Sequence, residues 1–383
     1  MQGLCTIYGT RALPCAAADV AAAASPAAAI ETLAGDGPAS ARFAVGLEGG
    51  RVVLSVIDAE APALRRQVEA LTHLVLGATG DEVDARGYEV VRQAAGAWQV
   101  VGVAWDGPSE APAAVTPLVE AVAQRLLGLV LRDGRLLDPA GRALLGEGPG
   151  ARDAQACVPL ADDACPRKAR SEERLASAGV AVNPRLPAMA GEPQVRLRAA
   201  DEVARRAQAL WAVAARADGI ERYDAIDLLL RRGLWDAATP AEQEFLRGEE
   251  APREVRLRWR RRAEALRTLL WALGHEAELG GLDAAGSLED MTRTLRAIPA
   301  EAFVRDAALR RTAGEVLDAA DLVYRAHWAI ADAASRGAEL PPGLHPAVVA
   351  QRHTALLWLL QHMKQPWTAL AAEDSSASAP RAP

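Results

Sequence analysis

The sequence has none of the short motifs that mark the common catalytic and nucleotide-binding sites. It contains no P-loop, no dinucleotide-binding glycine pattern and no nucleophile elbow between a strand and a helix. The His-Glu-x-x-His and Glu-x-x-His patterns of metal-binding helices are missing as well. These absences argue against the familiar hydrolases and nucleotide-dependent enzymes, and we expect a protein without catalytic activity.

Cysteine is scarce, and its spacing indicates no metal site. Cys5, Cys15, Cys157 and Cys165 form no Cys-x-x-Cys pair, and no histidine lies at zinc-finger spacing from them. We therefore expect reduced thiols in a cytoplasmic protein. A disulfide between Cys157 and Cys165 is the alternative.

Long apolar runs and an excess of basic residues are also missing. No run of about 18 apolar residues is free of charge, so no membrane span is expected. The net charge of -7 opposes general binding to nucleic acid. Residues 16–29 are rich in alanine, but Asp19 and the lack of a basic start favour an amphipathic helix over a signal peptide. We expect neither a nucleic acid nor a membrane as partner.

Strand and helix patterns alternate in the first part of the chain. We predict a strand at 4–8, a β-hairpin with a glycine turn at 43–57, and a helix that begins at Pro62. Another hairpin is predicted from 135 to 145. At 383 residues the chain is long enough for a second domain beyond these elements.

The hairpin and helix pattern is predicted to recur. Residues 88–92 and 98–105 suggest a second hairpin, and Pro112 begins a second helix. The tetrapeptide Glu-Ala-Pro-Ala precedes both helices, at 60–63 and at 110–113. This order suggests a duplicated hairpin–helix unit. The alternative is that an alanine-rich composition produced the tetrapeptide twice.

The second half is patterned almost entirely as helices. Apolar residues recur three and four apart over 200–217, 226–230, 259–273, 312–335 and 346–363. The stretch 239–242, Thr-Pro-Ala-Glu, has the order of a capping box with proline at the first helical position. Ser287 and Asp290 suggest another helix start.

These patterns predict an α+β protein. An N-terminal antiparallel-hairpin and helix domain at 1–145 precedes an all-α domain at 171–370. Residues 146–170, with Gly, Pro and Asp but no periodicity, are the predicted linker. Residues 371–383 are a predicted disordered tail.

Five segments of the second half mix aromatic, charged and aliphatic residues in a characteristic order. They are Arg170–Pro187, Leu197–Ala207, Trp259–Gly274, Asp318–Trp328 and Arg352–Leu359. Together they resemble a bacterial family known as domain of unknown function 4272, over residues from about 170 to 374. The resemblance implies a mostly helical domain and no known activity. Gln351, Leu357 and Thr368 depart from the polar residues that the family usually has there, so a site at those positions is altered in this chain.

The last two predicted long helices contain the candidate site. Asp321 can pair with Arg325 four residues on, and His327 and His353 fall on the apolar stripes of their helices. Two histidines and an aspartate can therefore converge, with Glu264 as a further oxygen ligand. The candidate polar cluster is Glu264, Asp318, Asp321, Tyr324, Arg325, His327, Trp328, Arg352 and His353.

Two interpretations of this cluster stay open. One is a metal-assisted hydrolase, since neutral imidazole is a common metal ligand and a carboxylate behind it orients the ring. The other is that each histidine donates to a neighbouring carbonyl or carboxylate and fixes how the helices pack. We favour the second interpretation and predict no metal and no cofactor.

An arginine-rich stretch offers a different kind of candidate. Its members are Arg253, Arg256, Arg258, Arg260, Arg261, Arg262 and Arg267, and the interleaved acids are Glu249, Glu250, Glu254 and Glu264. This mixture predicts a solvated, salt-bridged helix face rather than a nucleic-acid site. The whole sequence therefore predicts a non-enzymatic binding or interaction protein, with an unknown protein or small molecule as partner.

Overall fold

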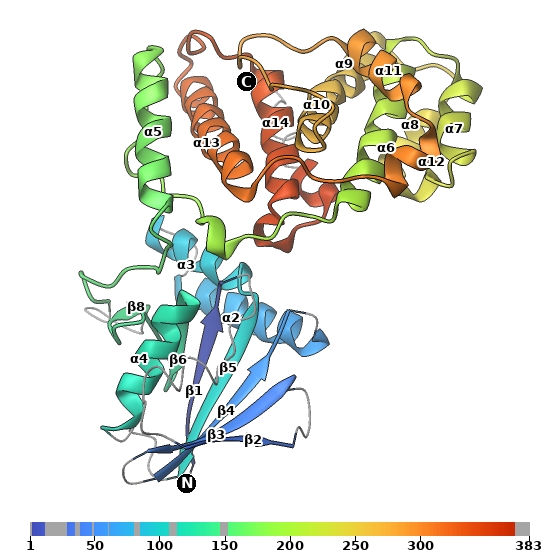
Figure 1. Ribbon diagram of the computed structural model, residues 1–383. Helices are drawn as coiled ribbons and strands as arrows, with labels where there is room; N and C mark the ends of the chain where they lie inside the picture. The colour runs from blue at the N-terminus through green and yellow to red at the C-terminus, as the bar shows by residue number, and fades with distance from the viewer. Residues whose placement is uncertain are drawn as a thin grey trace. The chain divides into compact units, whose positions relative to one another are not determined.

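The computed structural model describes residues 2–11, 29–34, 39–47, 50–59, 61–79, 85–106, 113–145 and 152–371 (Figure 1). The chain forms two compact units. One comprises Met1–Ala164 with Ala190–Val195, and the other comprises Cys165–Met189 with Arg196–Pro383. An antiparallel sheet region is followed by a mostly helical region, which confirms the α+β prediction. The predicted alanine-rich helix and most of the predicted tail lie outside the described residues.

The described part of the first unit contains one antiparallel sheet. Its strands are β1 (Gln2–Gly9), β2 (Ile30–Leu33), β3 (Ala41–Leu47), β4 (Gly50–Ile57), β5 (Gln99–Asp106), β6 (Gly128–Arg132), β7 (Arg135–Leu137) and β8 (Ala143–Leu145). Their order in the sheet is β2-β3-β4-β5-β1-β6-β7-β8. The predicted first strand and the hairpins β3–β4 and β7–β8 are confirmed.

One face of this sheet is buried because alternate residues of each strand point to it. The buried residues include Val52 and Leu54 of β4 and Val101 and Val103 of β5. Helix α4 (Val115–Leu126) covers this face with apolar residues spaced along one stripe, namely Val115, Leu118, Val119, Val122 and Leu126.

The predicted second hairpin is wrong in its first strand. Residues 85–95 form helix α3 (Ala85–Ala95), in which Val90, Val91 and Ala94 are buried at helical spacing. Helix α3 packs against α2 (Pro62–Thr79), so this contact, and not strand pairing, buries its valines. The hairpin is therefore not repeated before α4.

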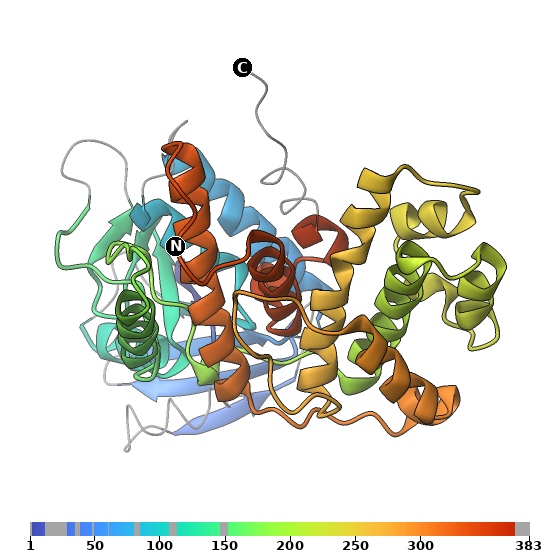
Figure 2. The ribbon, with the colours of Figure 1, turned by 90° about the horizontal axis from the view of Figure 1, so that it is seen from above.

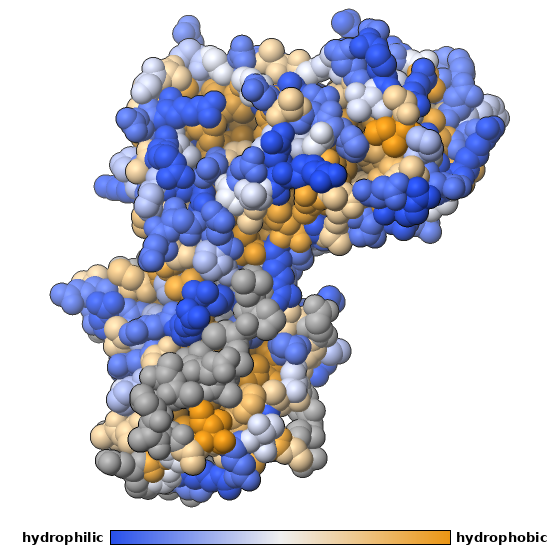
Figure 3. All heavy atoms as spheres, viewed as in Figure 1, coloured by the Kyte–Doolittle hydropathy of each residue, from blue (hydrophilic) through white to orange (hydrophobic). Residues whose placement is uncertain are grey.

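The second unit is built from packed helices. They are α5 (Ala164–Ser177), α6 (Ala200–Asp218), α7 (Arg222–Leu230), α8 (Pro240–Arg247), α9 (Arg253–Arg260), α10 (Arg262–Ala272), α11 (Leu288–Ala297), α12 (Ala300–Arg305), α13 (Ala313–Ser335) and α14 (Pro346–Leu359). Helix α6 is buried along most of its length and packs against α10, which packs against α14, and α14 packs against α13 (Figures 1 and 2). Hydrophilic side chains cover much of the visible face of this unit, with apolar patches between them (Figure 3).

Several predicted helix boundaries hold and others shift. The capping box is confirmed, because Thr239 Oγ1 accepts from the Glu242 amide and Glu242 accepts from the Thr239 amide. Helix α5 begins inside the predicted linker at Ala164, and the stripe over 259–273 is divided between α9 and α10. None of the described helices is long and apolar enough to cross a membrane.

The close contact between Gly3 and Trp105 gives a prediction for the sheet. The two residues face each other across β1 and β5, and a Cβ at Gly3 would overlap the Trp105 ring. We expect Gly3→Ala to lower the free energy of unfolding by about 1–3 kcal/mol through overpacking. Gly102→Ala is the control, since its Cβ would lie 3.8 Å from the nearest atom. Equal losses for the two variants in urea unfolding would contradict this account.

Candidate functional site

The predicted pair of Asp321 and Arg325 forms within α13 and is buried. Asp321 is 0% and Arg325 2% exposed, and Arg325 Nε and Nη2 donate to the two Asp321 oxygens at 2.9 Å. Arg325 Nη1 also donates to Glu172 of α5 at 3.2 Å, and Nη2 to the Pro187 carbonyl at 3.3 Å. All three guanidinium nitrogens therefore have protein acceptors, and the side chain joins α13 to α5.

Asp318 joins the same two helices at the surface. Its Oδ1 accepts from Arg167 Nε at 2.8 Å and from Arg170 Nη2 at 3.1 Å. Asp318 is about half exposed, while Arg167 is buried. This carboxylate is one turn away from Asp321 but binds different arginines.

The two candidate histidines meet, as the sequence predicts. The rings of His327 and His353 stack with centroids 4.5 Å apart. The ring of Tyr324 also stacks on His353, with centroids 6.2 Å apart. His353 Nε2 is shielded from solvent and has no hydrogen-bond partner within the described residues. Burial, with the nearby His327 and His362, lowers the pKa of His353 to about 3, and burial lowers the pKa of His327. Both rings are therefore neutral near pH 7.

Glu264 and Arg352 form a second buried pair, between α10 and α14. Arg352 Nε donates to Glu264 Oε2 at 3.0 Å, and the other Glu264 oxygen accepts from the Gly286 amide. Arg352 Nη1 donates to the Gly280 carbonyl at 3.1 Å. Burial lowers the pKa of Arg352, and the charge of Glu264 opposes this effect. Glu264 is thus a partner of Arg352 and does not join the histidines.

Arg352 also lies at the edge of a mostly apolar cavity of about 720 Å³, here called the Arg352 pocket. Its walls come from α5, α10, α13 and the loops at 277–282 and 342–344. The large apolar side chains that line it are Leu175, Val180, Trp271, Leu279, Leu282, Leu322, Val323 and Leu344. The Nη2 atom of Arg352 is shielded from solvent and makes no hydrogen bond in the described part of the chain, although the side chain is only 1% exposed.

The predicted cluster therefore separates into several distinct contacts. Of its members, Asp318 and Arg352 line the Arg352 pocket, whereas His327 and His353 form their own stack. Trp328 is partly buried on α13. Across the described ranges, no three side chains of His, Cys, Asp or Glu are placed to hold a metal ion. The cysteines Cys5, Cys157 and Cys165 are free, so the alternative disulfide is not formed.

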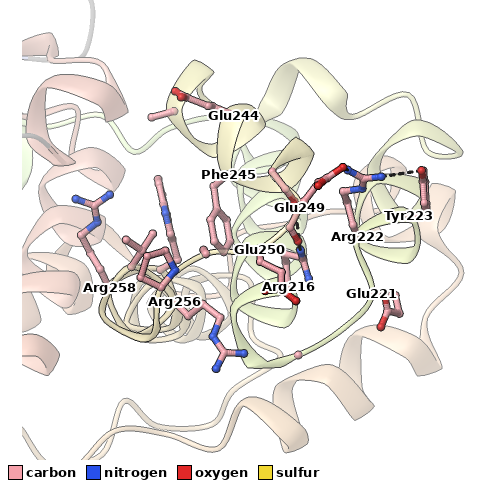
Figure 4. Close-up of a pocket in the computed structure, with 17 residues that line it drawn as sticks. Arg216, Glu221, Arg222, Tyr223, Glu244, Phe245, Glu249, Glu250, Arg256 and Arg258 are labelled. Carbon is pink, nitrogen blue, oxygen red and sulfur yellow. Dashed lines mark hydrogen bonds and ion pairs between the residues drawn. The ribbon is translucent and has the colours of Figure 1, made fainter.

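A second cavity, of about 1000 Å³, lies among α6, α7, α8 and α9 and was not predicted from the sequence (Figure 4). We call it the α8–α9 groove. Phe245 and Trp259 stack in it with ring centroids 5.2 Å apart. Arg222 donates to the Tyr223 hydroxyl at 2.7 Å, and Arg216 donates to the Glu249 carbonyl at 2.6 Å. The only sequence signal for this groove was the arginine-rich stretch on one side of it.

The salt-bridged face that we predicted for that stretch is only partly present. Arg260 pairs with Asp218 at 2.7 Å, and Arg267 approaches Glu276 at 3.9 Å. No ion pair forms for Arg253, Arg256, Arg258 or Arg261 among the residues that the structure describes. The prediction holds for only part of the stretch. Two of the interleaved acids pair with other arginines, Glu264 with Arg352 and Glu249 with Arg222, and Glu250 and Glu254 form no ion pair in the described part of the chain.

Comparison with known proteins places the helical unit in a family. The sequence pattern described as "Domain of unknown function (DUF4272)" matches residues 167–370, which is more than half of the 383-residue chain. The chain belongs to this family, as the resemblance of its tryptophan-bearing segments suggested. No curated protein and no solved structure matches the chain.

The buried pair within α13 gives a prediction for stability. Asp321→Asn leaves Arg325 with a weaker partner in a dry environment, and we expect a loss of about 3–5 kcal/mol in unfolding free energy. Asp332→Asn is the matched control on the same helix, because its pair with Arg336 is at the surface. This control should change stability by at most about 1 kcal/mol. A similar loss in both variants, measured by urea unfolding, would show that the buried pair of Asp321 contributes no more to stability than the surface pair of Asp332.

The histidine stack predicts a dependence of stability on pH. His353 is neutral in the folded protein down to pH about 3, whereas its pKa in the unfolded chain is the ordinary histidine value of 6.5. Its contribution is therefore complete above pH 6.5 and is lost as the pH falls from 6.5 toward 3. When the pH is lowered from 7.5 to 5, protonation of His353 in the unfolded chain should reduce the unfolding free energy by about 2 kcal/mol.

The variant His353→Phe keeps an aromatic ring but cannot bind the proton. Its unfolding free energy should fall by about 2 kcal/mol less than that of the unmodified protein over the same pH interval. His73→Phe replaces an exposed histidine of α2 and serves as the control. An unchanged pH dependence in His353→Phe would show that His353 does not remain neutral in the fold.

Proposed function

We propose that the helical unit is a non-enzymatic binding module, which holds a small apolar molecule with an acidic group in the Arg352 pocket. The observation that supports this most is the guanidinium of Arg352. It is almost fully buried beside an apolar cavity, and its Nη2 has no acceptor among the described residues. A carboxylate oxygen of a ligand would supply that acceptor.

The energetics favour an oxygen acceptor at this place. A buried donor without a partner costs about 1–3 kcal/mol, and a ligand oxygen would recover part of that cost. Hydrogen bonds to a charged donor such as arginine are stronger than neutral ones. The positive charge of Arg267 acts on Arg352 together with the negative charges of Glu264 and Asp283.

The walls favour an apolar body for the same ligand. A volume of about 720 Å³ is within the usual range for small-molecule sites, which are mostly apolar with a few polar groups. Leu175, Leu322 and Leu344 come from three separate segments of the chain and face the same space. Burial of an aliphatic or aromatic body against them contributes roughly 25 cal/mol for each Å² removed from water.

The alternative of a metal-assisted hydrolase has less support from the contacts. Both oxygens of Asp321 accept from Arg325, and both oxygens of Glu264 accept from the protein. His327 and His353 stack on each other and do not line the Arg352 pocket. A cytoplasmic location fits this binding role, and the free thiols of Cys5, Cys157 and Cys165 support a reducing compartment.

Three probes with one alkyl chain and different head groups test this proposal. By isothermal titration calorimetry we expect decanoate to bind more tightly than decanol, and decylamine to bind least. The order follows because only decanoate brings both an acceptor and a negative charge to Arg352. Equal affinity for decanoate and decylamine would contradict the assigned head group.

A variant that fills the cavity tests the site itself. Ala319→Trp places a large side chain in the pocket from α13, and we expect it to abolish decanoate binding while the fold is kept. Ala331→Trp, at an exposed position of the same helix, is the matched control and should bind as the unmodified protein does. Undiminished binding by Ala319→Trp would place the ligand elsewhere.

A further inference from the structure

Two buried donors without acceptors line another cavity, of about 600 Å³, that is separate from the Arg352 pocket. The indole Nε1 of Trp367 and the guanidinium Nε of Arg206 are shielded from solvent and make no hydrogen bond within the described residues. Trp367 is 6% and Arg206 5% exposed, and the guanidinium lies over the indole ring, 4.3 Å from its centroid. The two unused donors therefore belong to one wall of this cavity, which we call the Trp367 pocket.

The remaining nitrogens of Arg206 hold its guanidinium in place. Nη1 donates to Glu242 Oε2 at 2.8 Å and to the Ala237 carbonyl at 2.9 Å, and Nη2 donates to the other oxygen of Glu242. Because both ends of the guanidinium are fixed on Glu242, Nε cannot turn toward another acceptor without breaking this buried pair. Arg206 Nε and Trp367 Nε1 are thus left for an acceptor from outside the chain.

The chemistry of these two groups determines what can bind them. Both are N–H donors, and neither accepts a hydrogen bond. An ammonium group of a ligand would bring more donors and leave both unsatisfied, whereas an oxygen with free lone pairs can accept from them. A buried donor without an acceptor is costly, so an oxygen placed here removes a cost that the folded protein otherwise carries.

The charges around the pocket favour a neutral oxygen over a carboxylate. Each arginine that lines it has an acidic partner: Arg198 with Glu202, Arg205 with Asp201 and Arg206 with Glu242. Asp236 also lines the pocket, is exposed, and forms no ion pair in the part of the chain that the structure describes. A ligand carboxylate would lose its hydration without meeting a spare positive charge, which a neutral carbonyl does not require.

The rest of the wall is apolar. The large apolar residues that line the pocket with Trp367 are Leu234, Pro240, Trp358 and Pro366. A cavity of about 600 Å³ with apolar walls and a few polar groups has the usual size and character of a small-molecule site. These walls favour an apolar body beside the carbonyl group.

A strained connection carries the Trp367 wall. Gln361, Met363 and Lys364 follow α14 and have φ angles of 51°, 48° and 53°, although none of them is glycine. Residues with a Cβ adopt this left-handed region at a cost, and such strain is often found at ligand sites. A small shift of this segment relieves strain and opens the indole N–H of Trp367 to an oxygen in the pocket.

We propose that the Trp367 pocket binds a small neutral carboxamide with an apolar body. The carbonyl oxygen accepts from Trp367 Nε1 and Arg206 Nε, and the apolar body packs on Leu234, Pro240 and Trp358. The observations that support this site do not depend on the ligand proposed for the Arg352 pocket.

NMR titration of the full chain with three matched probes tests the head group. The probes are 4-butylbenzamide, 4-butylbenzoate and 4-butylbenzylamine, and the indole N–H signal of Trp367 is assigned by its loss in Trp367→Phe. We expect the amide to bind most tightly and to move this signal downfield, because the N–H gains an acceptor. The benzoate should bind at least about tenfold more weakly, and the amine should leave the signal in place.

Two variants test the site, each with a control. Trp367→Phe keeps an aromatic ring without the N–H and should weaken amide binding about tenfold, whereas Trp328→Phe, which lines neither pocket, should leave it unchanged. Thr368→Trp fills the Trp367 pocket from an exposed position and should abolish amide binding, whereas Ala331→Trp should not. Decanoate binding should be the same in Thr368→Trp as in the unmodified protein, which separates this site from the Arg352 pocket.

Four results would overturn the proposal. The first is no binding of the amide at millimolar concentration, and the second is binding of the amine or the benzoate as tightly as the amide. The third is amide binding without a shift of the Trp367 indole signal. The fourth is undiminished amide binding by Thr368→Trp, because the amide would then occupy another place.

Discussion

Buried arginines that bind buried carboxylates hold the helical unit together. Arg352 with Glu264 and Arg206 with Glu242 join segments that are distant in the chain, and Arg325, which binds Asp321 four residues away, also reaches the distant Glu172. A buried charge without its partner is costly, so each pair permits only those helix arrangements in which both members meet. Burial alone would raise the pKa of Glu242, but Arg206 and the Thr239 amide outweigh it and the pKa is lowered. The same carboxylate therefore caps α8 and anchors α6.

Arg325 and Arg352 differ in how completely the protein satisfies them, and the buried Nε of Arg206 likewise has no partner in the described part of the chain. Every guanidinium nitrogen of Arg325 has an acceptor, so this side chain is explained by the contact of α13 with α5. Arg352 keeps one donor without a partner in the described part of the chain, beside a cavity lined by leucines. A fully satisfied network stabilises the fold, whereas the unused donor of Arg352 is the observation on which the proposed ligand site rests.

Local sequence signals predicted the elements whose causes are local. The hairpin β3–β4, the capping box of α8 and the helix α6 that ends before Gly219 all follow from neighbouring residues. The second hairpin failed because valines suit a strand and a buried helix alike, and contact with α2 decided the outcome for α3. The division between α9 and α10 at Arg261 was missed because the apolar stripe continues across it.

By itself, the sequence determined the family, the long helices α6, α13 and α14, and the one pair that follows from helix geometry, Asp321 with Arg325. That pair is four residues apart on one helix, so its spacing already places the two side chains together. Glu264 and Arg352 are 88 residues apart, and only the packing of α10 on α14 made them partners. Arg256 and Arg258, by contrast, form no ion pair on the described surface, although acids surround them in the chain. Ionic partners are chosen by distance in space, which the tertiary structure sets and sequence spacing does not.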